Sequence, residues 1–198
     1  MILNNNWKLH SEMEKSEYLK NFGSYPVPKI LNDLFDFDTA VAFDNWFSNG
    51  FELINDSEKM MLRSYSDDES FLRSLVCFAN ADGTGSTYAL WIHHESDDLE
   101  KAPIVVFGSE GGFHIVAKNL IEFLQLLTFD GEPMVSWENV TYFKGEDEEE
   151  SKYHLEYKNW LRDSYEINPI SDASSLVANA QKTYQQEFNL WMKKYYSD

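Results

Sequence analysis

The chain has 198 residues, 43% of them hydrophobic and 25% charged, and a formal net charge of −18. This composition is typical of one globular domain that is long enough to bury a sizeable core. The 34 acids against 16 bases create a field that repels phosphate backbones, which argues against direct nucleic-acid binding. The same field attracts a basic protein partner, although a high charge also serves solubility alone.

The composition also favours a cytoplasmic protein. The single cysteine, Cys77, rules out an internal disulfide framework and lies in the apolar run "LVCFA", which is typical of a buried, inert thiol. The start of the chain shows no basic stretch followed by an apolar region, and no apolar run approaches the roughly 20 residues of a membrane helix. We therefore expect no membrane segment.

The N-terminal third shows three helical patterns. Residues 11–23 begin with capping-box spacing and end in glycine, and residues 28–35 begin with a proline suited to a first helical turn. The clearest helix is predicted over residues 38–50, with Asp38 as its N-cap. Its apolar face consists of Val41, Ala42, Trp46 and Phe47.

Four short apolar runs follow in the middle of the chain, separated by polar or glycine-rich turns. They read "SLVCFANA" (74–81), "TYALWIHHE" (87–95), "PIVVF" (103–107) and "FHIVA" (113–117). Runs of this length joined by turn residues predict an antiparallel meander. The next stretch, residues 118–127, switches to the helical period.

The last third is helical again. Residues 151–165 place aromatic and apolar side chains three to four positions apart, and residues 172–196 form a long amphipathic pattern that Asp172 can cap. Helices, then strands, then helices predict an α+β fold, with a central antiparallel sheet flanked by N-terminal and C-terminal helices. We expect a single domain over 1–198, with its core at about 28–130 and a C-terminal helical extension over 150–198.

The stretch "FGSEGGF" at 107–113 raises the question of a ligand-binding loop. Its glycines match neither G-x-G-x-x-G nor the phosphate loop, and its serine is not in G-x-S-x-G. Glu110 would repel a phosphate, and a strand-like run follows where both phosphate motifs need the start of a helix. We therefore predict a hairpin turn whose glycines supply positive φ, and a second such turn at "DGTGS", 82–86.

Histidine and cysteine show no local catalytic or metal-binding pattern. His93 and His94 are adjacent on a predicted strand, so they face opposite sides of a sheet. The apolar neighbours of Cys77 favour a raised thiol pKa, which opposes a nucleophile. We expect no enzyme activity, metal or cofactor, and we keep a small-molecule enzyme built on the "GSEGG" loop or the histidine pair as an alternative.

Three acidic clusters lie in predicted loops, at residues 67–69, 95–100 and 146–150. A charged run is by default a solvated segment, and its functional alternative is a patch that docks a basic protein. The residues expected to bind a partner come from the last two clusters, the glycine-rich loop and one tryptophan: Asp97, Asp98, Glu100, Glu110, Trp137, Glu146, Asp147, Glu148, Glu149 and Glu150.

The order of motifs in residues 75–127 resembles the SUKH superfamily. The resemblance is carried by Phe78-Ala79-Asn80 at a strand end, the turn Asp82-Gly83, the aromatic strand 88–92 and the helix start in 117–127. The family includes yeast cell-wall-assembly regulators of the Smi/Knr type and many bacterial immunity proteins. The resemblance implies an α+β domain that binds proteins and is not an enzyme. In bacteria it implies immunity, in which the protein binds a toxin, often a nuclease, and blocks its active site.

Two binding hypotheses remain open from the sequence. In the first, an acidic immunity protein occludes a basic toxin of a polymorphic toxin system, because a nuclease domain must be basic to hold phosphates. In the second, the same surfaces serve a regulatory or scaffold protein with another cellular partner. Both predict a basic protein partner, no direct nucleic-acid or membrane binding, and a monomer or homodimer.

Overall fold

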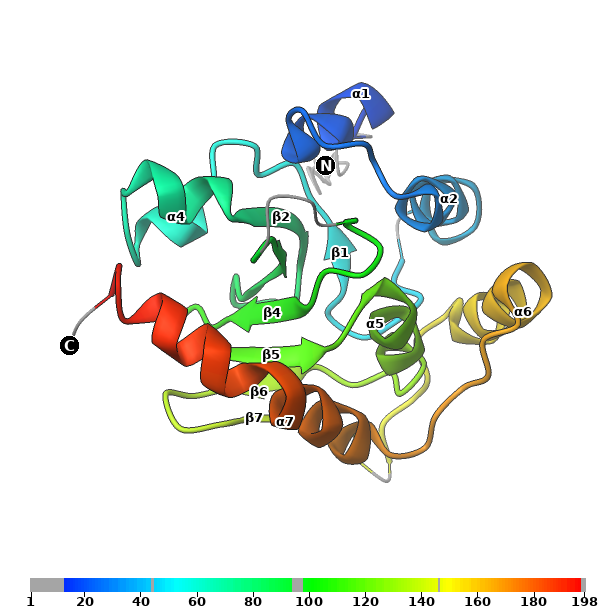
Figure 1. Ribbon diagram of the computed structural model, residues 1–198. Helices are drawn as coiled ribbons and strands as arrows, with labels where there is room; N and C mark the ends of the chain where they lie inside the picture. Colours follow the sequence, from blue (N-terminus) through cyan, green and yellow to red (C-terminus); the bar gives the residue numbers. More distant parts are fainter. Residues whose placement is uncertain (1–12, 44, 94–97, 146, 197–198) are drawn as a thin grey trace, which may run out of the picture.

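The computed structural model describes residues 13–43, 45–93, 98–145 and 147–196, and their fold is α+β, as the sequence predicts (Figure 1). Residues 11 and 12 of the first predicted helix lie outside this part. The helical elements that precede the main run of strands are α1 (Lys15–Tyr18), η1 (Leu19–Phe22), α2 (Lys29–Phe37), η2 (Asp38–Ala42), α3 (Met60–Arg63) and α4 (Glu69–Arg73).

The centre of the molecule is an antiparallel sheet whose strand order equals the chain order: β1 (Glu52–Leu53), β2 (Leu75–Asn80), β3 (Thr87–Trp91), β4 (Ile104–Phe107) and β5 (Phe113–Ala117). The predicted four-strand meander is confirmed, and β1 is an additional strand. The remaining elements are α5 (Leu120–Leu127), the hairpin β6 (Pro133–Val135) and β7 (Val140–Tyr142), α6 (His154–Tyr165) and α7 (Ala173–Met192).

Both faces of the sheet are buried along β2 to β5, and each of these four strands contributes to two cores. In β2, Val76 and Phe78 point into the first core, whereas Leu75 and Cys77 point into the second. This follows from the alternation of side chains along a strand. The first core is closed by α1, α2, α5 and α6, and the second by α3, α4 and most of α7. The sheet is therefore the middle layer between two sets of helices (Figure 1).

Residues 150–198, expected as a helical extension, form α6 and α7, and both helices contribute to the cores. Tyr157 of α6 is fully buried in the first core, and Phe188 of α7 is fully buried in the second. Asp172 caps α7 as predicted, because its carboxylate accepts the backbone N–H of Ser175. Neither these helices nor any other in the described part of the chain is long and apolar enough to cross a membrane.

The predicted helix over residues 38–50 is wrong beyond η2. α2 runs directly into this π-helical turn, so Asp38 lies inside a continuous helical stretch and does not cap a new helix. The chain leaves the helix at Phe43, whose φ of 43° is unfavourable in a right-handed helix. The helical stretch ends here because Phe47 turns into the first core. The centroid of its ring lies 4.5 Å from the centroid of the Tyr157 ring. Tertiary packing here overrides a local helical pattern.

The stretch at 107–113 is the β4–β5 turn, as predicted. Gly108 donates its N–H to the carbonyl of Gly112 at 2.9 Å, and Gly111 and Gly112 have φ of 104° and 88°. The β6–β7 hairpin also lies directly on this turn, and a Cβ on Gly112 would be 2.1 Å from the carbonyl oxygen of Ser136. Glycine is therefore required twice at this position, by the backbone conformation and by the close approach of the hairpin.

We expect Gly112→Ala to lower the free energy of unfolding by more than about 1 kcal/mol, because the methyl group meets both obstacles. Gly83→Ala is the matched control, since Gly83 also lies in a turn of the sheet but has nothing within 4 Å of its Cβ position. Urea unfolding followed by tryptophan fluorescence measures both variants. Equal stabilities would contradict the requirement for glycine at 112.

Asp38 in η2 is a partly buried carboxyl group with a raised pKa. Burial raises the pKa of Asp38 from 3.8 to about 7, and the charge of Glu52 adds to the rise. The folded protein therefore disfavours the ionised form of Asp38. The resulting loss of stability begins as the pH rises above about 3.8 and is complete above about pH 7.

We expect Asp38→Asn to increase the free energy of unfolding at about pH 8, and to change it much less at about pH 4, because asparagine carries no charge at either pH. Asp36→Asn is the control, since Asp36 is exposed and pairs with Lys15 at 2.6 Å. Denaturant unfolding at several pH values measures the difference. A gain from Asp38→Asn that does not change with pH would contradict the burial of a charge.

Candidate functional site

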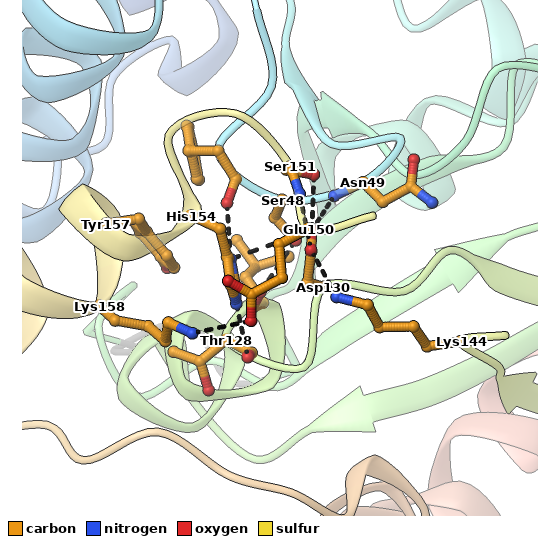
Figure 2. Close-up of polar contacts among 12 residues, drawn as sticks. Ser48, Asn49, Thr128, Asp130, Lys144, Glu150, Ser151, His154, Tyr157 and Lys158 are labelled. Atoms are coloured by element: carbon orange, nitrogen blue, oxygen red, sulfur yellow. Dashed lines mark hydrogen bonds and ion pairs between the residues drawn. The ribbon is translucent and has the colours of Figure 1, made fainter. Parts of the chain in front are cut away.

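A buried carboxylate, Asp130, joins three segments that are distant in sequence (Figure 2). Asp130 follows α5 with φ of 59° and is 1% exposed. It accepts the backbone N–H of Asn49 at 2.9 Å, Nζ of Lys144 at 2.8 Å, and both the N–H and the hydroxyl of Ser151 at 2.9 and 2.6 Å. The segment before β1, the end of β7 and the start of α6 therefore meet at one side chain. We call Asp130 and these donors the carboxylate clamp.

The bonds of the clamp keep Asp130 ionised despite its position. Burial acts to raise the pKa of Asp130, but the hydrogen bonds from Lys144 and Ser151 and the charge of His154 outweigh it and hold the pKa below 3.8. Bonds that involve an ionised partner are among the stronger ones in proteins. Removal of the carboxylate charge would weaken every bond of the clamp at once.

His154 lies beside the clamp and is 2% exposed. Its Nδ1 lies 2.9 Å from the carbonyl oxygen of Phe47, and its Nε2 lies 3.0 Å from the carbonyl oxygen of Thr128. Because a carbonyl oxygen can only accept, both ring nitrogens must donate, and this geometry requires an imidazolium. The positive charge is balanced by Asp130, whose Oδ1 lies 3.9 Å from Nδ1.

The carboxylate clamp presents the acidic segment, residues 147–150, at the surface. Lys144 and Ser151 bracket this segment, and both are bound to Asp130. All four acids of the segment are exposed. The carboxylates of this run repel one another, so the run needs anchoring points at its ends to stay in one conformation.

Two acids of the segment are bound locally and two are not. Glu148 accepts the backbone N–H of Gly145 at 3.0 Å and the side-chain amide of Asn49 at 2.9 Å. Glu150 pairs with Lys158 at 3.3 Å. No described residue forms a hydrogen bond or ion pair with the two remaining carboxylates, which belong to Asp147 and Glu149. These two carboxylates are the ones available to a cationic partner.

Two exposed aromatic residues lie close to the ends of the acidic segment, and neither was predicted as a binding residue. Trp46 is 50% exposed, and its carbonyl accepts the N–H of Tyr153 just after the segment. Phe143 is 67% exposed, and its ring comes within 4.0 Å of the Cβ position of Gly145. Aromatic anchors beside charged residues are typical of protein interfaces. We call Trp46, Phe143 and residues 147–150 the acidic–aromatic surface.

Glu110 and Trp137, also expected to bind a partner, lie together in another place. Glu110 is exposed in the β4–β5 turn. Trp137 is 51% exposed in the β6–β7 turn, and its indole packs against Gly111, next to Glu110. Phe143 directly follows β7, at the end of the hairpin away from its turn. The hairpin therefore separates Trp137 from the acidic segment.

Asp98 and Glu100 are exposed in the connection from β3 to β4. Asp98 accepts the N–H of Glu100 at 3.1 Å and pairs with Lys101 at 3.4 Å. The carbonyl of Glu100 accepts the N–H of Leu120 at the start of α5, which is the opposite end of β5 from Glu110. Asp97 and Glu146 lie outside the described residues. The described members of the predicted set thus occupy three separate places.

Neither Asp130 nor a role for His154 was predicted from the sequence. The Asn49 partner of Asp130 is 81 residues away, and the Phe47 partner of His154 is 107 residues away. The only local sign is the Asp-Gly pair at 130–131, which marks a turn and gives no hint of a clamp.

The described residues include no group of three or more His, Cys, Asp or Glu side chains that could hold a metal ion. His93 stacks on Trp91 with 4.7 Å between ring centroids, and His94 lies outside the described residues. Cys77 is a buried free thiol whose pKa is raised by burial, as the sequence analysis expected. The chemistry that the acidic–aromatic surface offers is negative charge and apolar contact.

Comparisons of the chain with protein-family models, with curated proteins and with solved structures found no match. The resemblance to the SUKH superfamily therefore stays a prediction.

We expect Asp130→Asn to lower the free energy of unfolding by about 3 kcal/mol at neutral pH, because it weakens a buried, multiply bonded charge and leaves Lys144 and His154 without their counter-ion. The pKa of Asp130 is lowered in the fold, so its contribution is present above about pH 3.8 and is lost as the pH falls below that value. The difference between wild type and variant should therefore shrink in acid.

Denaturant unfolding between about pH 3 and pH 7 measures this difference. Asp163→Asn is the matched control, since Asp163 is an exposed acid on α6 whose ion pair among the described residues is with its neighbour Arg162. A variant as stable as the wild type at neutral pH would disprove the role of the clamp.

Proposed function

We propose that the protein is a non-enzymatic, cytoplasmic binding module that binds a basic protein through the acidic–aromatic surface. We further propose that this partner is a nuclease toxin and that the protein occludes its active site as an immunity protein. The observation that carries the proposal is the exposed run of carboxylates at 147–150, fixed by a buried clamp beside Trp46 and Phe143. The resemblance to the SUKH superfamily supports the same reading.

Electrostatics explains why such a surface suits a nuclease. A nuclease must be basic around its active site to hold phosphates. An acidic protein with a net charge of −18 is attracted to that site from a distance and speeds encounter. The unbound carboxylates of Asp147 and Glu149 would stand where phosphates lie in the nuclease complex.

Charge alone gives fast encounter but a weak complex, so apolar anchors are needed to slow dissociation. Trp46 and Phe143 are exposed by half or more and lie beside the acids. Burial of these rings against the partner would supply that anchoring. The two kinds of residue therefore predict two different kinetic effects.

We expect the double variant Asp147→Lys/Glu149→Lys to slow association with the toxin by about tenfold at low salt, and to slow it less at about 1 M salt, where charges are screened beyond about 3 Å. Trp46→Ala should instead speed dissociation. Surface plasmon resonance with catalytically inactive nuclease toxin domains measures both rates, and co-expression with the active toxin measures protection of growth.

The matched control is Asp163→Lys/Glu187→Lys, which makes the same change in charge on exposed positions of α6 and α7. Equal slowing by both double variants would show that only net charge matters and would refute the surface. If deletion of the gene causes a phenotype in cells free of any toxin, a regulatory or scaffold role with another basic partner replaces immunity.

A further inference from the structure

A groove lies between α7, β5 and the β6–β7 hairpin. Figure 1 shows that α7 runs alongside these elements. It encloses about 1000 Å³. Its polar walls are formed by Gln181, Gln185 and Asn189 of α7, His114 of β5 and Asn139 of the hairpin. We call this surface the amide groove. Of the described residues predicted to bind a partner, Trp137 alone lines it.

One amide of the groove already binds main-chain groups. Gln185 accepts the backbone N–H of Ile115 through Oε1 at 2.8 Å and donates from Nε2 toward the carbonyl of Phe113 at 3.5 Å. β5 is the edge strand of the sheet, and these groups face away from β4. The side chain of Gln185 thus takes the place of a peptide group of a further strand. This shows that an amide in this groove is complementary to the peptide backbone.

Further hydrogen-bonding groups of the groove are left for a ligand. Gln185 donates to Oδ1 of Asn189 at 2.7 Å, which orients the amide of Asn189 and leaves its NH₂ group to donate. The amide of Gln181 is bound by no described residue. Because Gln181, Gln185 and Asn189 are spaced four residues apart, they form a row along one face of α7.

His114 adds an acceptor to this row of amides. It is 7% exposed, and its Nε2 lies 2.7 Å from the carbonyl of Ser136, so Nε2 donates. Burial lowers the pKa of His114 below 6.5, although the bond to Ser136 opposes this, so the ring is neutral at physiological pH. Nδ1 is then an acceptor, and it has no hydrogen-bond partner in the described part of the chain.

An aromatic wall closes one side of the groove. Trp137 and Tyr196 stack with 5.6 Å between centroids and 18° between planes, and Phe113 packs edge-on against both. Among the described residues that line the groove, the charged ones are Glu138 and Lys193, whose charges cancel. The groove therefore offers donors, an acceptor and an apolar wall without net charge.

We infer that the amide groove binds an extended, uncharged peptide segment of a partner protein through its main chain. Side-chain amides match the alternating N–H and C=O groups of such a segment, as Gln185 does for β5, and the aromatic wall accepts an apolar side chain. The net charge of −18 opposes nucleotides and other anions. This inference goes beyond the proposed function, because it uses other residues and needs no basic partner.

A library of random short peptides displayed on phage, selected on the full chain at about 0.5 M salt, tests the inference while charge-driven binding is screened. We expect enriched peptides with few charges that bind with a dissociation constant in the micromolar range, on the order of 1–100 μM. Gln181→Ala/Asn189→Ala should weaken this binding by about tenfold or more. Gln186→Ala is the matched control, since Gln186 is exposed on α7 and does not line the groove.

Main-chain recognition has its own readout. Methylation of single backbone nitrogens of the selected peptide should weaken binding more than alanine substitution of most of its side chains. The variant Asp147→Lys/Glu149→Lys should bind the peptide as the wild type does. The test of the amide groove is therefore independent of whether the acidic–aromatic surface binds a basic protein.

Several results would overturn the inference. They are the absence of any enriched peptide, equal binding to the wild type and to Gln181→Ala/Asn189→Ala, and indifference to backbone methylation. Binding of neutral oligosaccharides such as maltotriose or cellotriose that depends on Gln181 and Asn189 would make the groove a saccharide site instead.

Discussion

Both faces of the five-stranded sheet are apolar, and the need to cover them determines most of the fold. In β2, β3 and β4, nearly every residue is buried, and alternate residues enter different cores. In the described part of the chain, no helix lies between the strands of the meander β2–β5. The covering helices must therefore come from the segments before and after the meander. The N-terminal helices, α5 and α6 close one face, and α3, α4 and α7 close the other.

This arrangement also produces the amide groove. Because α7 must reach the second core, it runs alongside the edge strand β5, and Gln185 covers main-chain groups that would otherwise be an open edge. The β6–β7 hairpin reaches the same edge by packing on Gly111 and Gly112. The amide groove is the space that remains between these neighbours. Its location is a consequence of how the sheet is covered.

The carboxylate clamp solves a different problem, which is to hold a run of like charges against the body of the protein. Residues 147–150 bury no apolar side chain of their own, so hydrophobic burial does not fix them. Asp130 binds Lys144 and Ser151 on either side of the run, and His154 supplies a compensating charge. A buried charge is costly unless it is paired and fully hydrogen-bonded, and here each charge has partners. The acids can therefore remain exposed and ordered together.

The fold was predictable wherever the chain follows one local pattern. The apolar runs of the meander, the switch to helical period before α5 and the cap of α7 at Asp172 are all confirmed. The prediction fails at residues 38–50, where burial of Phe47 bends the chain out of a helical pattern. It also misses β1, which has two residues, and the β6–β7 hairpin, whose strands have three residues each. Strands this short contain too few residues for the alternation of apolar and polar side chains to predict them.

By itself, the sequence determined the charge of the protein, the position of residues 147–150 outside any helix or strand, the α+β class and the glycine-dependent turn at 107–113. The expected loop at 67–69 is wrong for Glu69, which begins α4 after the N-cap Asp68. Only the tertiary structure decided that residues 147–150 lie beside Trp46 and Phe143, that Glu110 and Glu100 lie at opposite ends of β5, and that Asp130 and His154 hold the acidic segment in place. The physical reason is distance along the chain. Periodicity and turn chemistry act over a few residues, whereas Asp130 binds Asn49 from 81 residues away and His154 binds Phe47 from 107 residues away. These groups meet only when the chain has folded.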